Sequence, residues 1–400
     1  MRWKALEVEI SRVTFLSRVG SGKEKMADLC REYEISRVTG YKWKNRLLEL
    51  GSVVLGSKER SCRPLRSPHR TVAWKEDRVI EMRRRYGWGA RKLRELLLRD
   101  GLALPAITIH RILVRHGMIG GQKRDHAAVL RFERSMCNEL WQVDFKGEYS
   151  LAKPSEGYCY PLSILDDHSR YAVGLYGLAH QRGNAVHQCL VGCFERHGVP
   201  EALLMDHGTP WWSTTNHFGL TWLSVFLMKQ GIELLWSGVG HPQTQGKVER
   251  FHRTLKEAVV HSGKPGNFME WQNWLAEFRR IYNEIRPHES LGMAVPASAY
   301  SPSRKEYNPC PPVWEYEAGS LVKNLNSQGM VEYHGRRYFV CESLAGELVQ
   351  ILPVKIKPES KTEDLLLVRY RRTYVREIEL ATGRSRPPAP GPHPPRITNE

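Results

Sequence analysis

Apolar residues recur at helical spacing through the first third of the chain. Within residues 25–33, Met26, Leu29, Cys30 and Tyr33 fall on one helical face. Ser36 is a good N-cap for a following helix, which Gly51 ends. Together with a helix over 4–18, these segments predict a helix-turn-helix module. A second set of helices over 74–86, 89–99 and 105–117 predicts another such module.

The pattern changes after residue 139 to short apolar runs that alternate with amphipathic helices. Strands are predicted over 140–144, 158–165, 171–178, before Asp206 and over 232–235, and helices over 184–197, 217–230, from 247 and over 268–283. This alternation indicates an α/β core. Beyond residue 312 the period becomes two, with strands over 331–333, 338–340, 348–351, 365–370 and 374–378. We expect a small all-β unit there, an SH3-like barrel.

These patterns divide the chain into eight predicted segments. They are a helix-turn-helix domain (1–57), a basic linker (58–72), a second helix-turn-helix domain (73–121), a second basic linker (122–138), the α/β core (139–300), a Pro-containing linker (301–312), the β-barrel (313–380) and a disordered Pro-rich tail (381–400).

The distribution of charge along the chain indicates a binding partner. The 400 residues carry a net charge of +17, and residues 1–135 hold 31 Lys and Arg against 15 Asp and Glu. The excess of positive charge therefore lies almost entirely in the helical modules, which predicts that they bind double-stranded DNA. We find no signal peptide and no apolar run of the ~18 residues that a membrane span needs. We therefore expect no membrane partner, a cytoplasmic location and reduced thiols.

Three acidic residues in the core occupy positions suited to binding a metal. Asp144 is at the end of a predicted strand, and Asp206 follows another and precedes His207-Gly208. Glu249 lies in the first turn of a helix that follows a polar loop, GHPQTQGKVE. The intervening lengths are 61 and 42 residues.

This order of Asp, Asp and helix-borne Glu resembles the integrase core of insertion-sequence DDE transposases. The resemblance covers roughly residues 140–291, and HPQTQGKVERFHRTLK is its most specific part. The segment LCREYEISRVTGYKW also resembles the helix-turn-helix of these transposases, although Glu34 stands where a turn glycine is usual. The resemblance implies a ribonuclease H-like fold with a five-stranded mixed sheet and helices on both faces.

It further implies the site and its chemistry. Asp144, Asp206 and Glu249 would be catalytic and would hold two Mg²⁺ ions, with Mn²⁺ as a substitute. The protein would bind the terminal inverted repeats of a mobile element, cleave them and transfer the strands into target DNA. A homo-oligomer on paired ends and a location in the bacterial cytosol follow from the same resemblance.

Residues expected to contact DNA lie in three places. The first helix-turn-helix presents Arg37, Thr39, Tyr41, Lys42 and Lys44, and the second presents Thr108, Arg111 and Arg115. In the core, Gln243, Gln245 and Lys247 belong to the polar loop and the helix start, and Arg253 and Lys256 follow Glu249 by four and seven residues on the same helical face.

Tryptophans follow Asp206 closely. Trp211 and Trp212 lie in a predicted loop, where they could stack on an unpaired base or simply pack within the loop. Trp222 belongs to the helix predicted over 217–230 and is expected to face inward.

Several polar residues suit a structural role. Asp166 and Asp167 fit a hairpin turn better than a metal site, with Arg170 paired to one of them. Cys189 and Cys193, near His187 and His197, fit a packed core helix better than a zinc site.

Two rival functions remain open for the whole chain. A helix-turn-helix regulator with a catalytically inactive core would keep the basic modules but would not need the three acids. A structure-selective nuclease of the same fold would need the acids but not two recognition modules.

Overall fold

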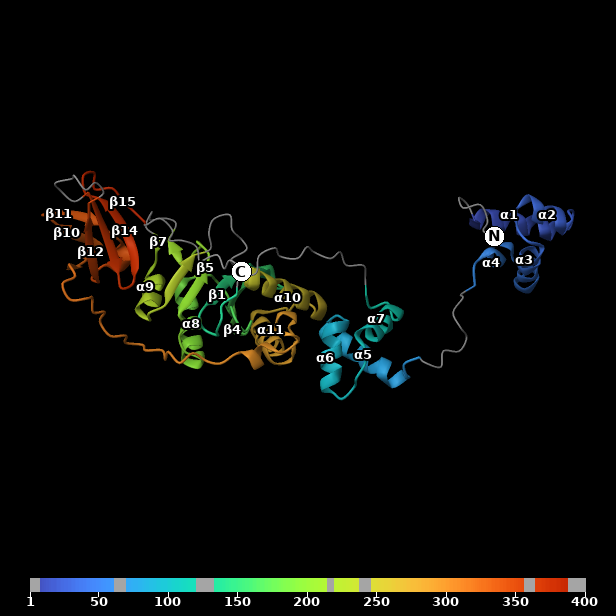
Figure 1. Cartoon of the computed structure of the whole chain (residues 1–400), viewed down its shortest axis with the longest axis horizontal. Helices are drawn as coiled ribbons and strands as arrows, with labels where there is room; N and C mark the ends of the chain where they lie inside the picture. Colours follow the sequence, from blue (N-terminus) through green and yellow to red (C-terminus); the bar gives the residue numbers. More distant parts are fainter. Residues whose placement is uncertain are drawn as a thin grey trace, which may run out of the picture. The chain divides into compact units, whose positions relative to one another are not determined.

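The computed structural model divides the chain into two compact units, Met1–Thr71 and Val72–Glu400 (Figure 1). The structure describes residues 8–60, 70–119, 133–213, 219–236, 246–355 and 364–387.

The first unit is a small helical bundle. Phe15, Leu16, Leu29 and Trp43 are among the side chains buried at its centre. The Ser36 hydroxyl accepts the Thr39 amide at 3.1 Å and so caps the third helix, as its sequence predicts. The helices are α1 (Val8–Ser21), α2 (Met26–Glu32), α3 (Arg37–Leu50) and the short α4 (Val53–Ser57).

The turn between α2 and α3 explains the unusual Glu34. This residue has φ = 53°, the left-handed conformation for which glycine is usual. Gly40 of α3 meets a different need, because a Cβ there would lie 2.5 Å from the Cys30 sulfur of α2. The helix-turn-helix geometry is therefore kept, with a glutamate held in the glycine conformation.

The second helical module belongs to the larger unit. Its helices α5 (Ala73–Tyr86), α6 (Ala90–Arg99) and α7 (Ala106–Arg115) close on a core that includes Val79, Leu93 and Ile109. His261 of the α/β core donates to the Arg84 carbonyl at 2.8 Å, and Arg99 donates to the Ile285 carbonyl at 3.0 Å. The module is thus bonded to the α/β core that follows it.

The α/β core is built on a mixed sheet with the order β4-β3-β1-β5-β8. Strand β3 is antiparallel to β1 and β4, whereas β5 and β8 run parallel to β1. This is the strand order of a ribonuclease H-like fold, as the resemblance implied. The strands are β1 (Trp141–Phe145), β3 (Tyr158–Asp166), β4 (Ala172–Leu178), β5 (Ala202–Met205) and β8 (Glu233–Trp236), with β2 (Tyr149–Ser150) paired to the start of β3.

Helices cover both faces of this sheet. Side chains of α8 (Gly183–His197) and α9 (Trp222–Lys229) pack on one face around Trp141. Side chains of α10 (Gly246–Ser262) and α11 (Phe268–Arg280) pack on the other around Leu165. Shorter elements are β6 (Trp212–Ser213), β7 (Gly219–Leu220), the π-turn Ile281–Ile285 and the 3₁₀ segments Pro154–Glu156, Glu289–Leu291, Pro296–Ala299 and Glu342–Leu344.

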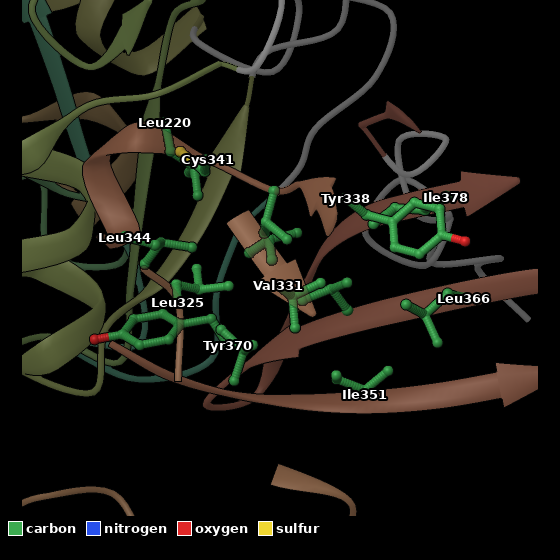
Figure 2. Close-up of a cluster of buried hydrophobic side chains, with 14 of the residues drawn as sticks. Leu220, Leu325, Val331, Tyr338, Cys341, Leu344, Ile351, Leu366, Tyr370 and Ile378 are labelled. Atoms are coloured by element: carbon green, nitrogen blue, oxygen red, sulfur yellow. The ribbon is translucent and has the colours of Figure 1, made fainter. Parts of the chain in front are cut away.

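The C-terminal unit is all-β and shares its apolar core with α9. Figure 2 shows Leu220 of the α/β core beside Cys341 and near Leu344. Arg371 donates to the Lys229 carbonyl at 2.6 Å, at the end of α9. A five-stranded antiparallel sheet, β15-β14-β13-β12-β9, accompanies a separate hairpin, β10-β11, and the SH3-like closure stays a prediction. The strands are β9 (Val322–Asn324), β10 (Met330–Tyr333), β11 (Arg336–Phe339), β12 (Leu348–Val354), β13 (Leu365–Tyr370), β14 (Thr373–Glu379) and β15 (Ser385–Arg386).

Several element boundaries differ from the sequence predictions; the first helix, for example, extends to Ser21 instead of residue 18. The helix predicted over 217–230 begins only at Trp222, where Thr221 and Ser224 form a capping box. Trp222 therefore lies at the helix start and is 47% exposed instead of pointing inward. The tail predicted from residue 381 also begins later, because β15 pairs with β14 through Ser385 and Arg386. Residues 388–400 lie outside the described part of the chain.

Candidate active site

Asp144 lies near the end of β1, the central strand of the sheet. It pairs in register with Ser163 of β3, and its side chain is 22% exposed. Burial, followed by the charges of Asp206 and Glu249, raises the pKa of the Asp144 carboxyl to about 7. Both carboxylates therefore lie close enough to Asp144 to act on it electrostatically.

Asp206 directly follows β5, the strand parallel to β1. Its Oδ1 accepts the Gly208 amide at 3.1 Å, which turns the chain after the strand. A Cβ at Gly208 would lie 2.9 Å from Asp206 Oδ2, so only glycine leaves this carboxylate in place. The Asp-His-Gly sequence thus holds the Asp206 carboxylate at the edge of the sheet.

Glu249 lies in the first turn of α10, where the helix dipole favours an anion. Its neighbour Val248 is buried, whereas Glu249 itself is exposed. Within the described ranges, no three Asp, Glu, His or Cys residues stand close enough together to hold a metal ion. In this structure the three acids are therefore electrostatic neighbours that are not grouped closely enough to form a ligand set.

Hydrogen bonds show that residues 166–170 form a turn, as the sequence predicts. Asp166 accepts from the Asn138 amide at 2.7 Å and from the Ser169 amide at 2.8 Å. The expected pairing of Arg170 with one of the two aspartates is wrong. Its guanidinium lies 3.0 Å from Glu133 and also donates to the carbonyls of Asp167 and His168.

Lys247 is placed differently from the prediction of a DNA contact. Its ammonium lies 2.5 Å from Asp167 Oδ2, and its side chain is only 15% exposed. Burial lowers the pKa of Lys247 to about 8, and the charge of Asp167 opposes this shift. The Lys247 side chain therefore lies in the interior, where it pairs with the buried carboxylate of Asp167 on a distant turn.

The remaining core residues predicted to contact DNA are on or next to α10. Arg253 and Lys256 are exposed, as a DNA-facing role requires. Arg253 lies 3.4 Å from Glu257, an exposed pair of the kind that contributes little to stability. Gln243 and Gln245 lie outside the described residues.

In the first helix-turn-helix, Arg37, Tyr41 and Lys42 are exposed along α3. Together with Asn45, they line a shallow groove on that helix. Thr39 and Lys44 are half-buried, and the Thr39 hydroxyl lies 2.9 Å from that of Ser36. The groove face of α3 is therefore accessible to a ligand.

In the second module, Arg111 is exposed on α7 and Thr108 is half-buried. Arg115 lies 2.6 Å from Glu76, a buried carboxylate of α5. Arg115 therefore holds α7 to α5, which limits it as a DNA contact.

The sequence pattern identified only some of the aromatic residues next to Asp206. Trp211 is 1% exposed and belongs to the core, so it packs and is not open to a base. Trp212 contacts His207 and Trp236, with ring centroids 5.2 and 4.9 Å away. No sequence motif marks His207 or Trp236. They lie at the ends of the parallel strands β5 and β8, and this position is the signal that would have identified them as neighbours of Trp212.

The two cysteines near His187 and His197 lie on α8. Cys193 is buried, with its sulfur 3.2 Å from the Tyr176 hydroxyl, and burial raises the pKa of the Cys189 thiol to about 12. Packing in the core accounts for both cysteines.

In the portion of the chain that the structure describes, no helix is long and apolar enough to cross a membrane.

Comparison with known proteins agrees with the class defined by this sheet and its three acids, a ribonuclease H-like core with an acidic edge. Residues 134–242 and 230–296 match two models of the integrase core domain. The chain thus carries an integrase core of the type found in insertion-element transposases.

Two similar proteins are encoded by insertion elements. The chain is 27% identical over 234 residues to the insertion element IS476 uncharacterized 39.2 kDa protein of Xanthomonas euvesicatoria, covering 55% of this chain and 62% of the relative. It is 24% identical to the insertion element IS407 uncharacterized 31.7 kDa protein of Burkholderia multivorans, covering 55% and 78%. A magnesium complex of the HTLV-2 integrase catalytic core domain aligns over 41% of this chain and 97% of that one, with 14% identity and a TM-score of 0.31.

Proposed function

We propose that this protein is a DNA transposase that binds the terminal inverted repeats of its element and catalyses Mg²⁺-dependent strand cleavage and strand transfer. The observation that carries the proposal is the placement of Asp144 near the end of β1, Asp206 directly after the parallel strand β5 and Glu249 in the first turn of α10, where the charges of Asp206 and Glu249 help to raise the pKa of Asp144. Three carboxylates from a strand, a strand end and a helix start form the acidic edge that phosphoryl transfer with divalent metals requires.

The donor set fits Mg²⁺. All three residues offer hard oxygen ligands, and the raised pKa of Asp144 marks a place where a cation would relieve repulsion. Asp144, Asp206 and Glu249 would hold two ions, with Mn²⁺ as a substitute. The bound metal would polarise the phosphate and activate the attacking oxygen. The chain itself would orient the DNA, with Arg253 and Lys256 along its path.

Paired element ends would also require more than one active site. We propose a homo-oligomer on these paired ends. Light scattering of the complex with end DNA measures the number of chains, and one chain per paired-end complex would contradict this part of the proposal.

The test is a strand-transfer assay on a gel, with end DNA identified from the inverted repeats that flank the gene. Asp144→Asn, Asp206→Asn and Glu249→Gln should each lower cleavage and joining at least ~100-fold while keeping end binding. Glu257→Gln is the matched control, because Glu257 is an exposed acid on the same helix and should keep activity. Near-normal joining by any one of the three variants would remove that residue from the site.

The same assay decides between the transposase and its rivals. A helix-turn-helix regulator with an inactive core would bind the ends and form no product. A structure-selective nuclease would cleave and form no joined product.

A further inference from the structure

Polar side chains interrupt the apolar contact between β1 and α10. Gln142 of β1 is fully buried there. Its Oε1 accepts the Val248 amide at 3.2 Å, and its Nε2 donates to Asp167 Oδ1 at 2.8 Å. Only this orientation of the side-chain amide places a donor against the carboxylate and an acceptor against the N–H group. The first N–H groups of a helix have no acceptor within the helix itself. Gln142, on β1, supplies an acceptor for one of them, the N–H group of Val248.

Asp167 connects the same helix turn to the β3–β4 turn. Its Oδ2 lies 2.5 Å from Lys247 Nζ and accepts the Arg134 amide at 2.8 Å. Asp167 is fully buried, and these partners supply the hydrogen bonds and the opposite charge that a carboxylate needs in the interior. Lys247 and Val248 are therefore each held from outside α10, by Asp167 and Gln142.

The two anchored residues directly precede Glu249. Gln142 precedes Asp144 by two residues on β1, so both side chains point to the same face of the sheet. Three residues after Glu249, His252 lies 2.9 Å from the Ser163 hydroxyl of β3. Glu249 itself remains exposed, between anchored residues on both sides.

We propose that Gln142, Asp167 and Lys247 are positioning residues that hold the first turn of α10 against β1 and thereby keep Glu249 facing Asp144. The inference rests on the proposed function in one respect, since it takes Glu249 as a metal ligand. The contacts themselves do not depend on it. A purely structural role would affect stability alone, whereas positioning also affects the affinity for the metal.

The test uses the full-length double variant Asp167→Asn/Lys247→Met. It replaces both members of the buried pair by neutral residues, so neither is left as an unpaired buried charge. Gln142→Met is the second variant, since it keeps the side-chain length and removes both hydrogen bonds. Two quantities are measured, namely amide hydrogen exchange across α10 without metal and the calorimetric affinity for Mn²⁺.

We expect amides 247–250 to exchange at least tenfold faster in the double variant, with amides 255–260 of the same helix unchanged. Mn²⁺ should bind about tenfold more weakly, the usual effect of losing a residue that orients a metal ligand. The control is Lys229→Met/Glu347→Gln, a different lysine–carboxylate pair at 2.5 Å, which joins α9 to the C-terminal unit. This control should change neither quantity.

The outcomes separate the two proposals. Unchanged exchange at 247–250 would overturn the anchoring, and faster exchange with unchanged Mn²⁺ affinity would overturn the positioning of Glu249. A wild-type protein that binds no Mn²⁺ would overturn the proposed function and the positioning of Glu249 together, while the exchange result would still decide whether these side chains hold the helix turn.

Discussion

Asp144 and His252 face each other across the contact between β1 and α10, with Oδ2 and Nδ1 3.6 Å apart. This is not an ion pair, because burial lowers the pKa of His252 to about 3 and leaves the ring neutral. Asp144 thus has a neutral neighbour in His252 and anionic neighbours in Asp206 and Glu249. The ionised form of Asp144 is therefore unfavourable in the folded protein.

This environment predicts how stability depends on pH without metal. The pKa of Asp144 rises from an ordinary 3.8 to about 7 in the fold. Its contribution is therefore neutral below pH 4, becomes unfavourable as pH rises, and is fully unfavourable above pH 7. Asp144→Asn should stabilise the metal-free protein at pH 8, by on the order of 4 kcal/mol, and should have no such effect near pH 4. Thermal denaturation at both pH values measures this, and equal gains at both would contradict the assigned cause.

The exposed face of α10 predicts a path for DNA. Lys256→Glu should reduce end cleavage strongly and leave folding and metal binding intact, because Lys256 is an exposed cation near Glu249. A crosslinker at position 256 should capture the terminal nucleotides. Lys153→Glu, an exposed lysine elsewhere on the core, is the control for net charge. Full cleavage by Lys256→Glu at physiological salt would show that Lys256 is simply solvated.

The left-handed Glu34 predicts a stabilising substitution. Glu34→Gly should slow amide exchange in α2 and α3, since glycine adopts φ = 53° without a steric cost. A gain of about 0.5–1 kcal/mol is expected, after the greater freedom of glycine in the unfolded chain is subtracted. Glu32→Gly is the opposing control, because Glu32 lies in α2 and pairs with Arg18 at 2.6 Å. Faster exchange in Glu34→Gly would mean that the glutamate side chain itself holds the turn.

The uneven charge predicts a division of labour. A fragment of residues 1–125 should bind the element ends specifically, with affinity falling roughly 10³-fold or more between 50 and 200 mM salt if six or more phosphates are contacted. A fragment of residues 139–400 should bind DNA weakly and without sequence preference. Footprinting both fragments on the same end DNA measures this. Specific protection by the second fragment would place recognition in the core.

Sequence reasoning placed the elements well because their signals are local. Ser36 and Gly51 mark the ends of α3 by their own chemistry, and the alternation of strands and helices predicts the core. The order Asp144, Asp206, Glu249 is visible in the sequence, and their mutual influence follows from two parallel strands ending at one edge.

Long-range pairings could not be predicted in this way. Lys247 looks like a DNA contact in the sequence because its partner, Asp167, is on a distant turn whose proximity depends on the packing of α10. Arg170 likewise pairs with Glu133 instead of a neighbouring aspartate. Trp222 was predicted to face inward because the apolar pattern does not show the capping box that shortens α9, which depends on hydroxyl geometry.

The shared apolar core of the C-terminal unit and α9 limits where the chain can be divided. Leu220, Val225 and Met228 of the α/β core are buried together with side chains of the β strands. A protein ending at residue 312 would leave these three without their cover and would lose the hydrogen bond from Arg371 to the end of α9. The Pro-containing segment before residue 313 therefore resembles a domain boundary in the sequence, but an α/β core that ended there would expose an apolar patch and would be poorly soluble.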